Sequence, residues 1–309
     1  MAQCLSIIVF PGGANLPLWT GIRQGFFAQL DIDVQPSYTR NSVEQISGLV
    51  NGTWDIGLTG FDNIVAYQEG QGEASLDREP DLFAFMGSDN AFLRLVVQPD
   101  IKSYADLKGR VLSVDAMTTG FAFVLRKMLA LNGLSEGDVT FERAGGALQR
   151  YDALKEGRHA GTLLLTPFEL TGRSFGLQVL QSASDVLPHY QGVVGVASRA
   201  WARDNADRLD RFIAGYLLAL RWLYQKDNAQ AACAILMENV PYMTAELAAA
   251  TRGLLLAENG GFDPAARLDG DGMKTVLALR SEYGRPQKKL GDDQKYVDLG
   301  YYYRAVARI

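Results

Sequence analysis

The first two-thirds of the chain alternates between short runs typical of β-strands and segments whose apolar residues recur at helical spacing. Beyond Trp201 the strand signals end and only helical segments follow. Repeats of strand, helix and strand favour right-handed parallel crossovers, so we predict an α/β fold with helices on both faces of the sheet. The predicted strands span 7–10, 54–58, 93–97, 111–114, 139–141, 162–165 and 193–197, and the late helices span 209–224, 229–237, 244–258 and 273–283.

Size and charge narrow the classes of partner. The chain has 309 residues, and at roughly 100 to 200 residues per domain this favours two domains or two lobes. Lys and Arg total 30 against 35 for Asp and Glu, the net charge is −5, and no basic cluster is present. We therefore expect no nucleic acid partner and no binding to anionic membranes. No apolar run reaches the roughly 18 residues of a membrane-spanning helix.

The two cysteines, Cys4 and Cys233, are too few for a disulfide scaffold or a metal site. We expect both to be buried free thiols, because cysteine is often simply buried. A disulfide between them is the alternative.

The junctions between predicted strands and helices are the expected place for a ligand. In open α/β sheets a ligand lies beyond the carboxyl ends of the strands, where the next helices begin. Four junctions carry unusual residues, at 12–19, 60–63, 118–121 and 166–168. At the third, two threonines and Gly120 lead directly into an amphipathic helix. Its first amides can receive an anion, with Thr118 and Thr119 as further donors; the alternative is that one threonine only caps the helix.

Aromatic residues on or beside these junctions are candidates for the wall of a mostly apolar pocket with a few fixed polar groups. The alternative for each is a place in the hydrophobic core. They are Trp19, Phe61, Phe121, Phe168 and Tyr190.

The charges near the junctions bear on the ligand. Almost no Lys or Arg is present in them, which argues against a multiply charged ligand. Arg94 and Arg143 are the cations that remain candidates to reach the site. Asp62 has two candidate roles: it caps a helix over 62–67, or it pairs with an amine on the ligand.

One short motif raises a hydrolytic alternative. Residues 172–176 match G-x-S-x-G, and Asp185 and His189 follow in the order of a hydrolase triad. A nucleophile elbow follows a strand and opens a helix, whereas here helical signals precede the motif and a strand-like segment at 177–180 follows it. The context therefore argues against a hydrolase.

No metal or cofactor site is predicted. The chain has two histidines and no H-E-x-x-H, C-x-x-C or EF-hand spacing. Residues 269–272 are short of a calcium loop, and a turn in which Asp271 caps the last helix explains them better. Because the sequence also lacks a Walker A loop and a G-x-G-x-x-G motif, no nucleotide cofactor is expected.

An ordered series of phrases resembles a known family. They are NGTWDIG at 51–57, SYADLKGR at 103–110 followed by a strand and Thr119-Gly120, YDALKEG at 151–157 and PHY at 188–190. The series is similar to the solute-binding proteins of ABC importers, which have the type II periplasmic binding fold. The branch it resembles most is that of sulfonates, taurine, nitrate and pyrimidine precursors (NMT1-like). The resemblance covers nearly the whole chain, most firmly 42–210.

The resemblance implies two α/β lobes joined by two crossing strands, with the C-terminal helices packed on the first lobe. The first lobe would comprise residues 1–87 and 194–309 and the second 88–193, with Asp89 and Asn90 at the first crossing. Ligand would be trapped between the lobes by hinge closure. The junctions and the resemblance together predict ligand-binding residues Asn15, Trp19, Gly60, Phe61, Asp62, Asn90, Thr118, Thr119, Gly120, Phe121, Phe168 and Tyr190.

The expected function is that of a non-catalytic receptor that binds a small organic ligand, monoanionic or neutral and including aromatic, sulfonate, carboxylate or pyrimidine compounds. The resemblance implies a monomer that presents its closed form to an ABC permease in the membrane, with ATP hydrolysis left to the partner. It also implies a periplasmic or extracytoplasmic location, with the signal peptide absent from this sequence. The alternatives are a ligand-sensing subunit of a signalling receptor or an enzyme on the same fold. One such enzyme makes the thiamin pyrimidine with a cysteine-rich iron motif, to which nothing here compares.

Overall fold

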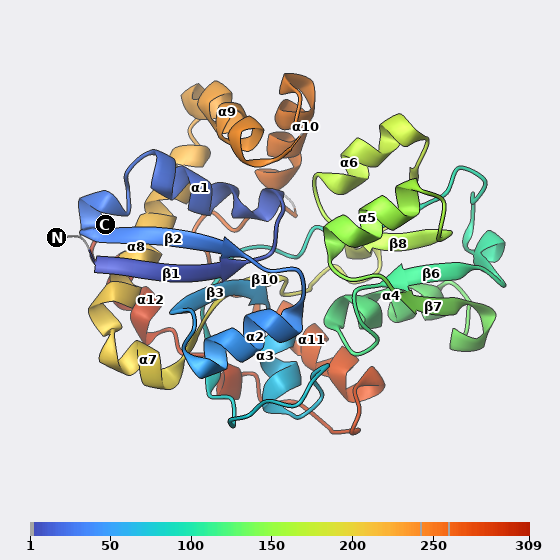
Figure 1. The fold of residues 1–309 in the computed structure, drawn as a ribbon, viewed down its shortest axis with the longest axis horizontal. Coiled ribbons are helices and arrows are strands. Elements are labelled where there is room, and N and C mark those ends of the chain that lie inside the picture. Colours follow the sequence, from blue (N-terminus) through green and yellow to red (C-terminus); the bar gives the residue numbers. More distant parts are fainter. Residues whose placement is uncertain (1–2, 242, 259) are drawn as a thin grey trace.

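The computed structural model describes residues 3–241, 243–258 and 260–309. They form two lobes, each built on a five-stranded sheet with helices on its faces (Figure 1). The strands are β1 (Gln3–Val9), β2 (Ile32–Tyr38), β3 (Ile56–Gly60), β4 (Leu82–Gly87), β5 (Arg94–Val97), β6 (Val111–Val114), β7 (Thr140–Arg143), β8 (Gly161–Leu164), β9 (Gln178–Ser182) and β10 (Val193–Ser198). The α-helices are α1 (Leu16–Arg23), α2 (Ser42–Asn51), α3 (Phe61–Gln68), α4 (Gly120–Leu131), α5 (Ala147–Lys155), α6 (Phe168–Gly172), α7 (Arg199–Asp204), α8 (Ala206–Leu223), α9 (Ala229–Asn239), α10 (Ala245–Leu255), α11 (Gly270–Tyr283) and α12 (Gly300–Val306).

The two sheets are mixed, with one reversed strand in the interior of each. The first lobe has the order β2-β1-β3-β10-β4 and the second β7-β6-β8-β5-β9. β1 pairs in parallel with β2 and β3, and β6 pairs in parallel with β7 and β8. β10 and β5 run antiparallel to both of their neighbours.

The predicted α/β class and two-lobed fold are confirmed, and the expected parallel pairing holds between β1, β2 and β3 and between β6, β7 and β8, but not for β5 and β10. Each of these strands enters its sheet directly from the other lobe. No helix of the same lobe precedes either as a crossover, so the rule that makes strand–helix–strand units parallel does not apply to them.

The hydrophobic core has two main parts. One lies between the first sheet and α1, α8, α9 and α12, where Phe27 stacks on Phe212 with ring centroids 5.4 Å apart. The other runs from the opposite face of the first sheet, through α3, α11 and α4, to the second sheet. Because this second part is continuous across both lobes, they are packed against each other beside α11.

The helices that follow β10 pack on the first lobe, and two of them, α10 and α11, also contact the second lobe. α8 and α12 pack against each other beneath the first sheet, whereas α10 contacts α6 and α11 contacts both α3 and α4 (Figure 1). In the described part of the chain no helix has the length and apolar character needed to cross a membrane.

Several local expectations needed adjustment. A capping box over 42–45, which the sequence pattern Ser-x-x-Gln suggests, is not formed: α2 is capped by Asn41, whose side chain accepts from the Glu44 amide. α11 begins earlier than predicted and is capped by Asp269, not Asp271. Cys4 and Cys233 are unpaired as expected, but Cys4 is exposed and Cys233 only partly buried.

Candidate functional site

A cavity of about 380 Å³ lies between the lobes. On the first lobe its wall comes from the turns that follow β1, β2 and β3, and on the second from those that follow β6, β7 and β8. The carboxyl ends of all six strands therefore face one space, as expected for a ligand crevice in α/β sheets. Apolar wall residues include Phe10, Leu58, Phe121, Leu148 and Leu165.

The structure places half of the predicted binding residues on this wall and half elsewhere. Asn15, Gly60, Asp62, Thr119, Gly120 and Phe121 line the cavity. Trp19, Phe61, Asn90, Thr118, Phe168 and Tyr190 are not part of its wall. Whether the six wall residues contact a ligand stays a prediction.

Three of the predicted aromatic residues are packed away from the cavity. Trp19 is buried and donates from Nε1 to the Tyr38 hydroxyl at 2.9 Å. Phe61 is fully buried with its ring edge against Tyr296, and Phe168 packs on Tyr151 with centroids 5.4 Å apart. An aromatic residue at a strand–helix junction fits a core as well as a pocket, and these three stabilise the core.

The remaining predicted residues off the wall have other partners. Asn90 and Tyr190 line a second, smaller cavity of about 90 Å³ beside the crossing segments. Thr118 donates from Oγ1 to Glu73 at 2.8 Å. On the wall itself, Asn15 uses its side-chain amide to donate to the carbonyls of Phe10 and Gly12, at 2.7 and 3.2 Å. Asn15 therefore fixes the turn after β1.

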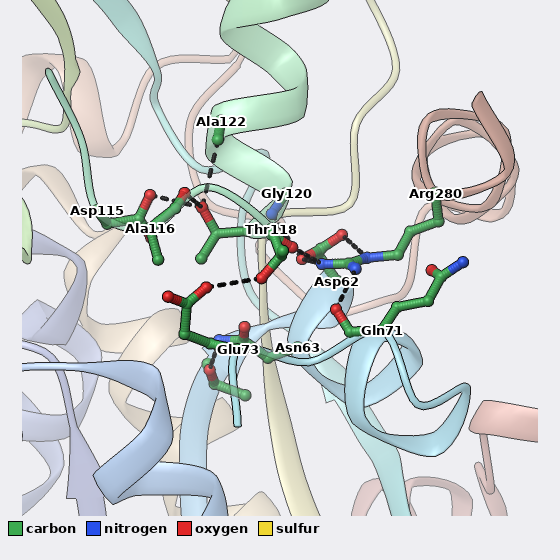
Figure 2. A network of polar contacts seen from close by, with 12 residues as sticks. Asp62, Asn63, Gln71, Glu73, Asp115, Ala116, Thr118, Gly120, Ala122 and Arg280 are labelled. Carbon is green, nitrogen blue, oxygen red and sulfur yellow. Dashed lines mark hydrogen bonds and ion pairs between the residues drawn. The ribbon is translucent and has the colours of Figure 1, made fainter. Parts of the chain in front are cut away.

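Asp62, a residue of the cavity wall, is the centre of a buried ionic network (Figure 2). Arg280 of α11 donates from Nε to Oδ1 and from Nη2 to Oδ2, both at 2.6 Å. Arg280 is 0 % exposed, also donates to the Thr118 carbonyl at 2.7 Å, and lies 4.8 Å from the centroid of the Phe123 ring. The Gly120 amide, at the start of α4, donates to Asp62 Oδ2 at 2.7 Å.

This network joins α3 of the first lobe, α4 of the second and α11. The predicted role of Asp62 as a helix cap was wrong, because the N-cap of α3 is Gly60 and no side chain caps this helix. The Asp62 carboxylate instead accepts the hydrogen bond from the first amide of α4. It thus takes the anion position at this helix N-terminus that the sequence analysis predicted for a ligand. Thr119 caps α4, accepting from the Ala122 amide at 3.4 Å and donating to Asp115 at 2.6 Å.

Three glycines bring the lobes into contact around the cavity. A Cβ atom on Gly120 would lie 2.3 Å from Asp62 Cγ, well inside contact distance. One on Gly13, in the first lobe, would lie 3.1 Å from the Thr166 carbonyl oxygen of the second. One on Gly146, in the second lobe, would lie 3.0 Å from the Arg40 carbonyl oxygen of the first. The absence of a side chain at each position lets the two lobes approach closely.

Arg150 is a cavity residue that the sequence analysis missed. It lies in the first turns of α5 and is 2 % exposed. Nη1 donates to the Gly145 carbonyl at 2.9 Å and Nη2 to the Leu163 carbonyl at 3.1 Å, while the nearest carboxylate oxygen, on Asp115, is 3.8 Å away. Burial lowers the pKa of Arg150, and the charge of Asp115 partly opposes this.

The two arginines that were candidates to reach the site have carboxylate partners outside the wall. Arg94 forms an ion pair with Glu169 at 3.1 Å, and Arg143 forms one with Glu73 at 3.0 Å.

A sequence signal for Arg150 was present in the Gly145-Gly146 pair that precedes its helix. Paired glycines at a strand–helix junction allow close approach of a ligand or of another backbone.

The crossing segments are tied together by Asp89. This buried carboxylate accepts from the amides of Ala91 and Val193, at 2.7 and 3.1 Å, and its own carbonyl accepts from the Gly192 amide at 2.9 Å. Burial raises the pKa of Asp89 to about 6, against the lowering effect of these amides. Asp89 thus links the segment that leaves the first lobe to the one that returns.

The hydrolase motif has no active geometry. Residues 172–176 lie at the end of α6 and before β9, and Ser174 donates from Oγ to the Thr171 carbonyl at 2.8 Å. In the described ranges no group of three or more His, Cys, Asp or Glu side chains is arranged to hold a metal ion.

Comparison with known proteins adds a family and a set of similar folds. The sequence model described as NMT1/THI5 like matches residues 14–229. A comparison with curated proteins found no match.

Similar solved structures include a protein of Bordetella bronchiseptica RB50, with a TM-score of 0.82 and 20% identity over 99% of this chain and 98% of that one. The periplasmic nitrate-binding protein NrtA from Synechocystis PCC 6803 has a TM-score of 0.81 and 13% identity over 100% and 89% of the two chains. The alkanesulfonate-binding protein SsuA from Xanthomonas axonopodis pv. citri, bound to MOPS, has a TM-score of 0.74 and 17% identity over 96% and 99%.

Proposed function

The chain belongs to the NMT1/THI5-like family, and from this membership we propose that it is the solute-binding receptor of an ABC importer. It captures a small organic ligand in the cavity between its lobes and presents the closed form to a membrane permease. The receptor works as a monomer in the periplasm or another extracytoplasmic space. We place the lobe boundaries at residues 87/88 and 193/194, where β4 ends and β10 begins.

The observation that carries the proposal is the cavity itself. Six strand ends from two lobes surround about 380 Å³, which is within the usual size range for small-molecule sites. The similar nitrate-binding and alkanesulfonate-binding proteins support a binding role. Support for a non-enzymatic role is that neither Cys4 nor Cys233 is among the wall residues and that Ser174 is used in a helix turn.

Closure follows from contacts with both lobes. A ligand shifts a conformational equilibrium only to the extent that it binds one state better than the other. A ligand that touches the turns after β1 to β3 and the turns after β6 to β8 makes all of these contacts only when the lobes are together. The open form would lose the contacts of one lobe and bind more weakly.

A thermal-shift screen over sulfonates, carboxylates, amino acids and pyrimidines tests the proposal. A ligand of the native state at 100 times its Kd stabilises the protein by about 2.7 kcal/mol, which is a clear shift in Tm. Mass analysis of the recovered ligand distinguishes binding from turnover, since a receptor returns its ligand unchanged.

A pair of variants tests whether the ligand lies in this cavity. Gly60 is on the wall, has an ordinary backbone conformation, and a Cβ there meets nothing within 4 Å, so Gly60→Trp fills cavity space. Gly291 is exposed and equally free of neighbours, which makes Gly291→Trp the matched control. The ligand-induced shift should vanish in Gly60→Trp and persist in Gly291→Trp. Equal ligand-induced Tm shifts in both variants would show that the ligand binds outside this cavity.

A further inference from the structure

Arg150 is a buried cation without a hydrogen-bonded carboxylate. Its side chain is 3 % exposed, its Nη1 and Nη2 donate only to backbone carbonyls, and Asp115 Oδ1 at 3.8 Å is beyond hydrogen-bond distance. That oxygen already accepts from the Thr119 hydroxyl at 2.6 Å. Burying a charge is costly unless it is paired and hydrogen-bonded, so the groups of the protein itself only partly compensate this guanidinium.

The charges around the cavity add to this. Its wall contains Arg40, Asp62, Asp115 and Arg150, and Arg280 lies directly behind Asp62. Asp62 and Arg280 neutralise each other through two short hydrogen bonds. The remaining three groups are two cations and one anion, so one negative charge on a ligand would balance the site.

The first turn of α5 supplies further donors beside the Arg150 side chain. Its N-cap, Gly146, has no side chain to bond the free amides of the turn. Among the residues that the structure describes, no acceptor bonds the amides of Ala147, Leu148 or Gln149, and all three residues line the cavity. The positive end of the helix dipole and the guanidinium therefore lie on the same wall.

We propose that Arg150, with the first amides of α5, binds a singly charged oxyanion head group of the ligand, a carboxylate or a sulfonate. The apolar wall of Phe10, Leu58, Phe121 and Leu165 receives an uncharged apolar body. The inference rests on the proposed receptor function and narrows its ligand class, which family membership leaves open, from monoanionic or neutral compounds to monoanions.

Matched pairs of probes test the charge requirement by titration calorimetry. Hexanoate with hexanamide and benzoate with benzamide form the carboxylate arm, and hexanesulfonate and benzenesulfonate with their sulfonamides form the sulfonate arm. Wild type should bind the anion of at least one pair roughly 10- to 150-fold more tightly than its neutral isostere, the range for a charge-assisted hydrogen bond. Unequal results in the two arms identify which oxyacid the site takes.

Two variants move the affinity in opposite directions. Arg150→Gln should remove most of the anion preference while leaving the affinity for neutral probes within about threefold, since the neutral probes do not use the lost charge. Asp115→Asn keeps an oxygen for the Thr119 hydroxyl but removes the competing charge, so it should tighten anion binding several-fold. Arg150→Lys, which keeps the charge without the planar fork, should retain part of the preference. Arg158→Gln, an exposed change of equal charge on the same lobe, is the control.

The outcomes separate this inference from the receptor proposal. If the neutral isosteres bind wild type as tightly as the anions, or if Asp115→Asn weakens anion binding, the role of Arg150 is refuted while a receptor remains. If Arg150→Gln does not fold, the opposite sign expected for Asp115→Asn still decides. If no compound in the broad screen or in these pairs stabilises wild type, the receptor proposal itself is refuted.

Discussion

Replacing Gly120 with alanine places a methyl group where the Asp62 carboxylate lies. The added Cβ would stand 2.3 Å from Cγ and 2.6 Å from Cβ of Asp62, so the second lobe and this carboxylate have to move apart. Gly120 has an ordinary helical conformation at the first position of α4, and alanine is tolerated there within the lobe itself. The cost is therefore expected in the contact between lobes.

The size of the effect follows from the contacts that are lost. The hydrogen bond from the Gly120 amide to the ionised Asp62 spans 2.7 Å, and such charged bonds contribute about 1.5 to 3 kcal/mol. Loss of that amount shifts the balance between open and closed forms by roughly 10- to 150-fold. Where the ligand-free protein is mainly open, the apparent ligand affinity falls by the same factor, because less of the protein is competent to bind. A shift that also disturbs the bonds to Arg280 would increase the loss.

Titration calorimetry with a ligand from the thermal-shift screen measures this loss. The control is Gly270→Ala, because Gly270 is also the first residue of a helix and a Cβ there meets nothing within 4 Å. We expect Gly270→Ala to bind like wild type. If Gly120→Ala binds within about threefold of wild type, the contact between Gly120 and Asp62 does not limit closure, and the reasoning fails.

Three further predictions concern the ionic groups. Asp62→Asn leaves Arg280 buried without its anion and should lower the free energy of unfolding by about 3 to 5 kcal/mol, as measured by urea titration. The double variant Asp62→Asn with Arg280→Met should recover part of this loss, because it no longer buries an unpaired cation. Burial by itself would raise the pKa of Glu69, but hydrogen bonds, the strongest of them from Lys295, lower this pKa to about 2. Wild type should therefore be more stable than Glu69→Gln above pH 4.5 and should lose that advantage as the pH falls toward 2. Burial raises the pKa of Asp89 to about 6. The stability of wild type relative to Asp89→Asn should therefore fall as the pH rises from about 4 to 6 and level off above pH 6. A stability difference between the two proteins that does not change with pH contradicts this.

The walls of the cavity could be predicted because they depend on local pattern and on topology. Thr119 and Gly120 stand at the junction of an apolar strand and an amphipathic helix, and the ends of parallel strands necessarily share one edge of a sheet. The same local pattern could not decide whether Trp19, Phe61 or Phe168 faces the cavity or the core. Side chains of equal apolarity suit both surroundings, and only packing against distant elements separates them.

The charged groups were missed for a different reason. Arg280 is 218 residues from Asp62 in sequence, and nothing local to either residue indicates the pair. Arg150 lies on a helix with polar neighbours, which suggests a solvated face, but the Leu163 carbonyl on β8 and the Asp115 side chain after β6 bury it. Long-range packing decides such cases.

Some strands escaped prediction for reasons visible in the sheets. β2 contains Pro36 and forms an edge of the first sheet, the position where a strand tolerates proline. β4 is buried on both faces, so its run of apolar residues has no period-two alternation to mark it as a strand.

Small-angle X-ray scattering of the ligand-free and the ligand-saturated protein tests the central claim, that a ligand is held between two lobes that close on it. We expect a smaller radius of gyration with ligand, and a scattering curve that then matches the structure in which Gly13, Gly120 and Gly146 bring the lobes together. Tight binding with identical scattering in both states would contradict it.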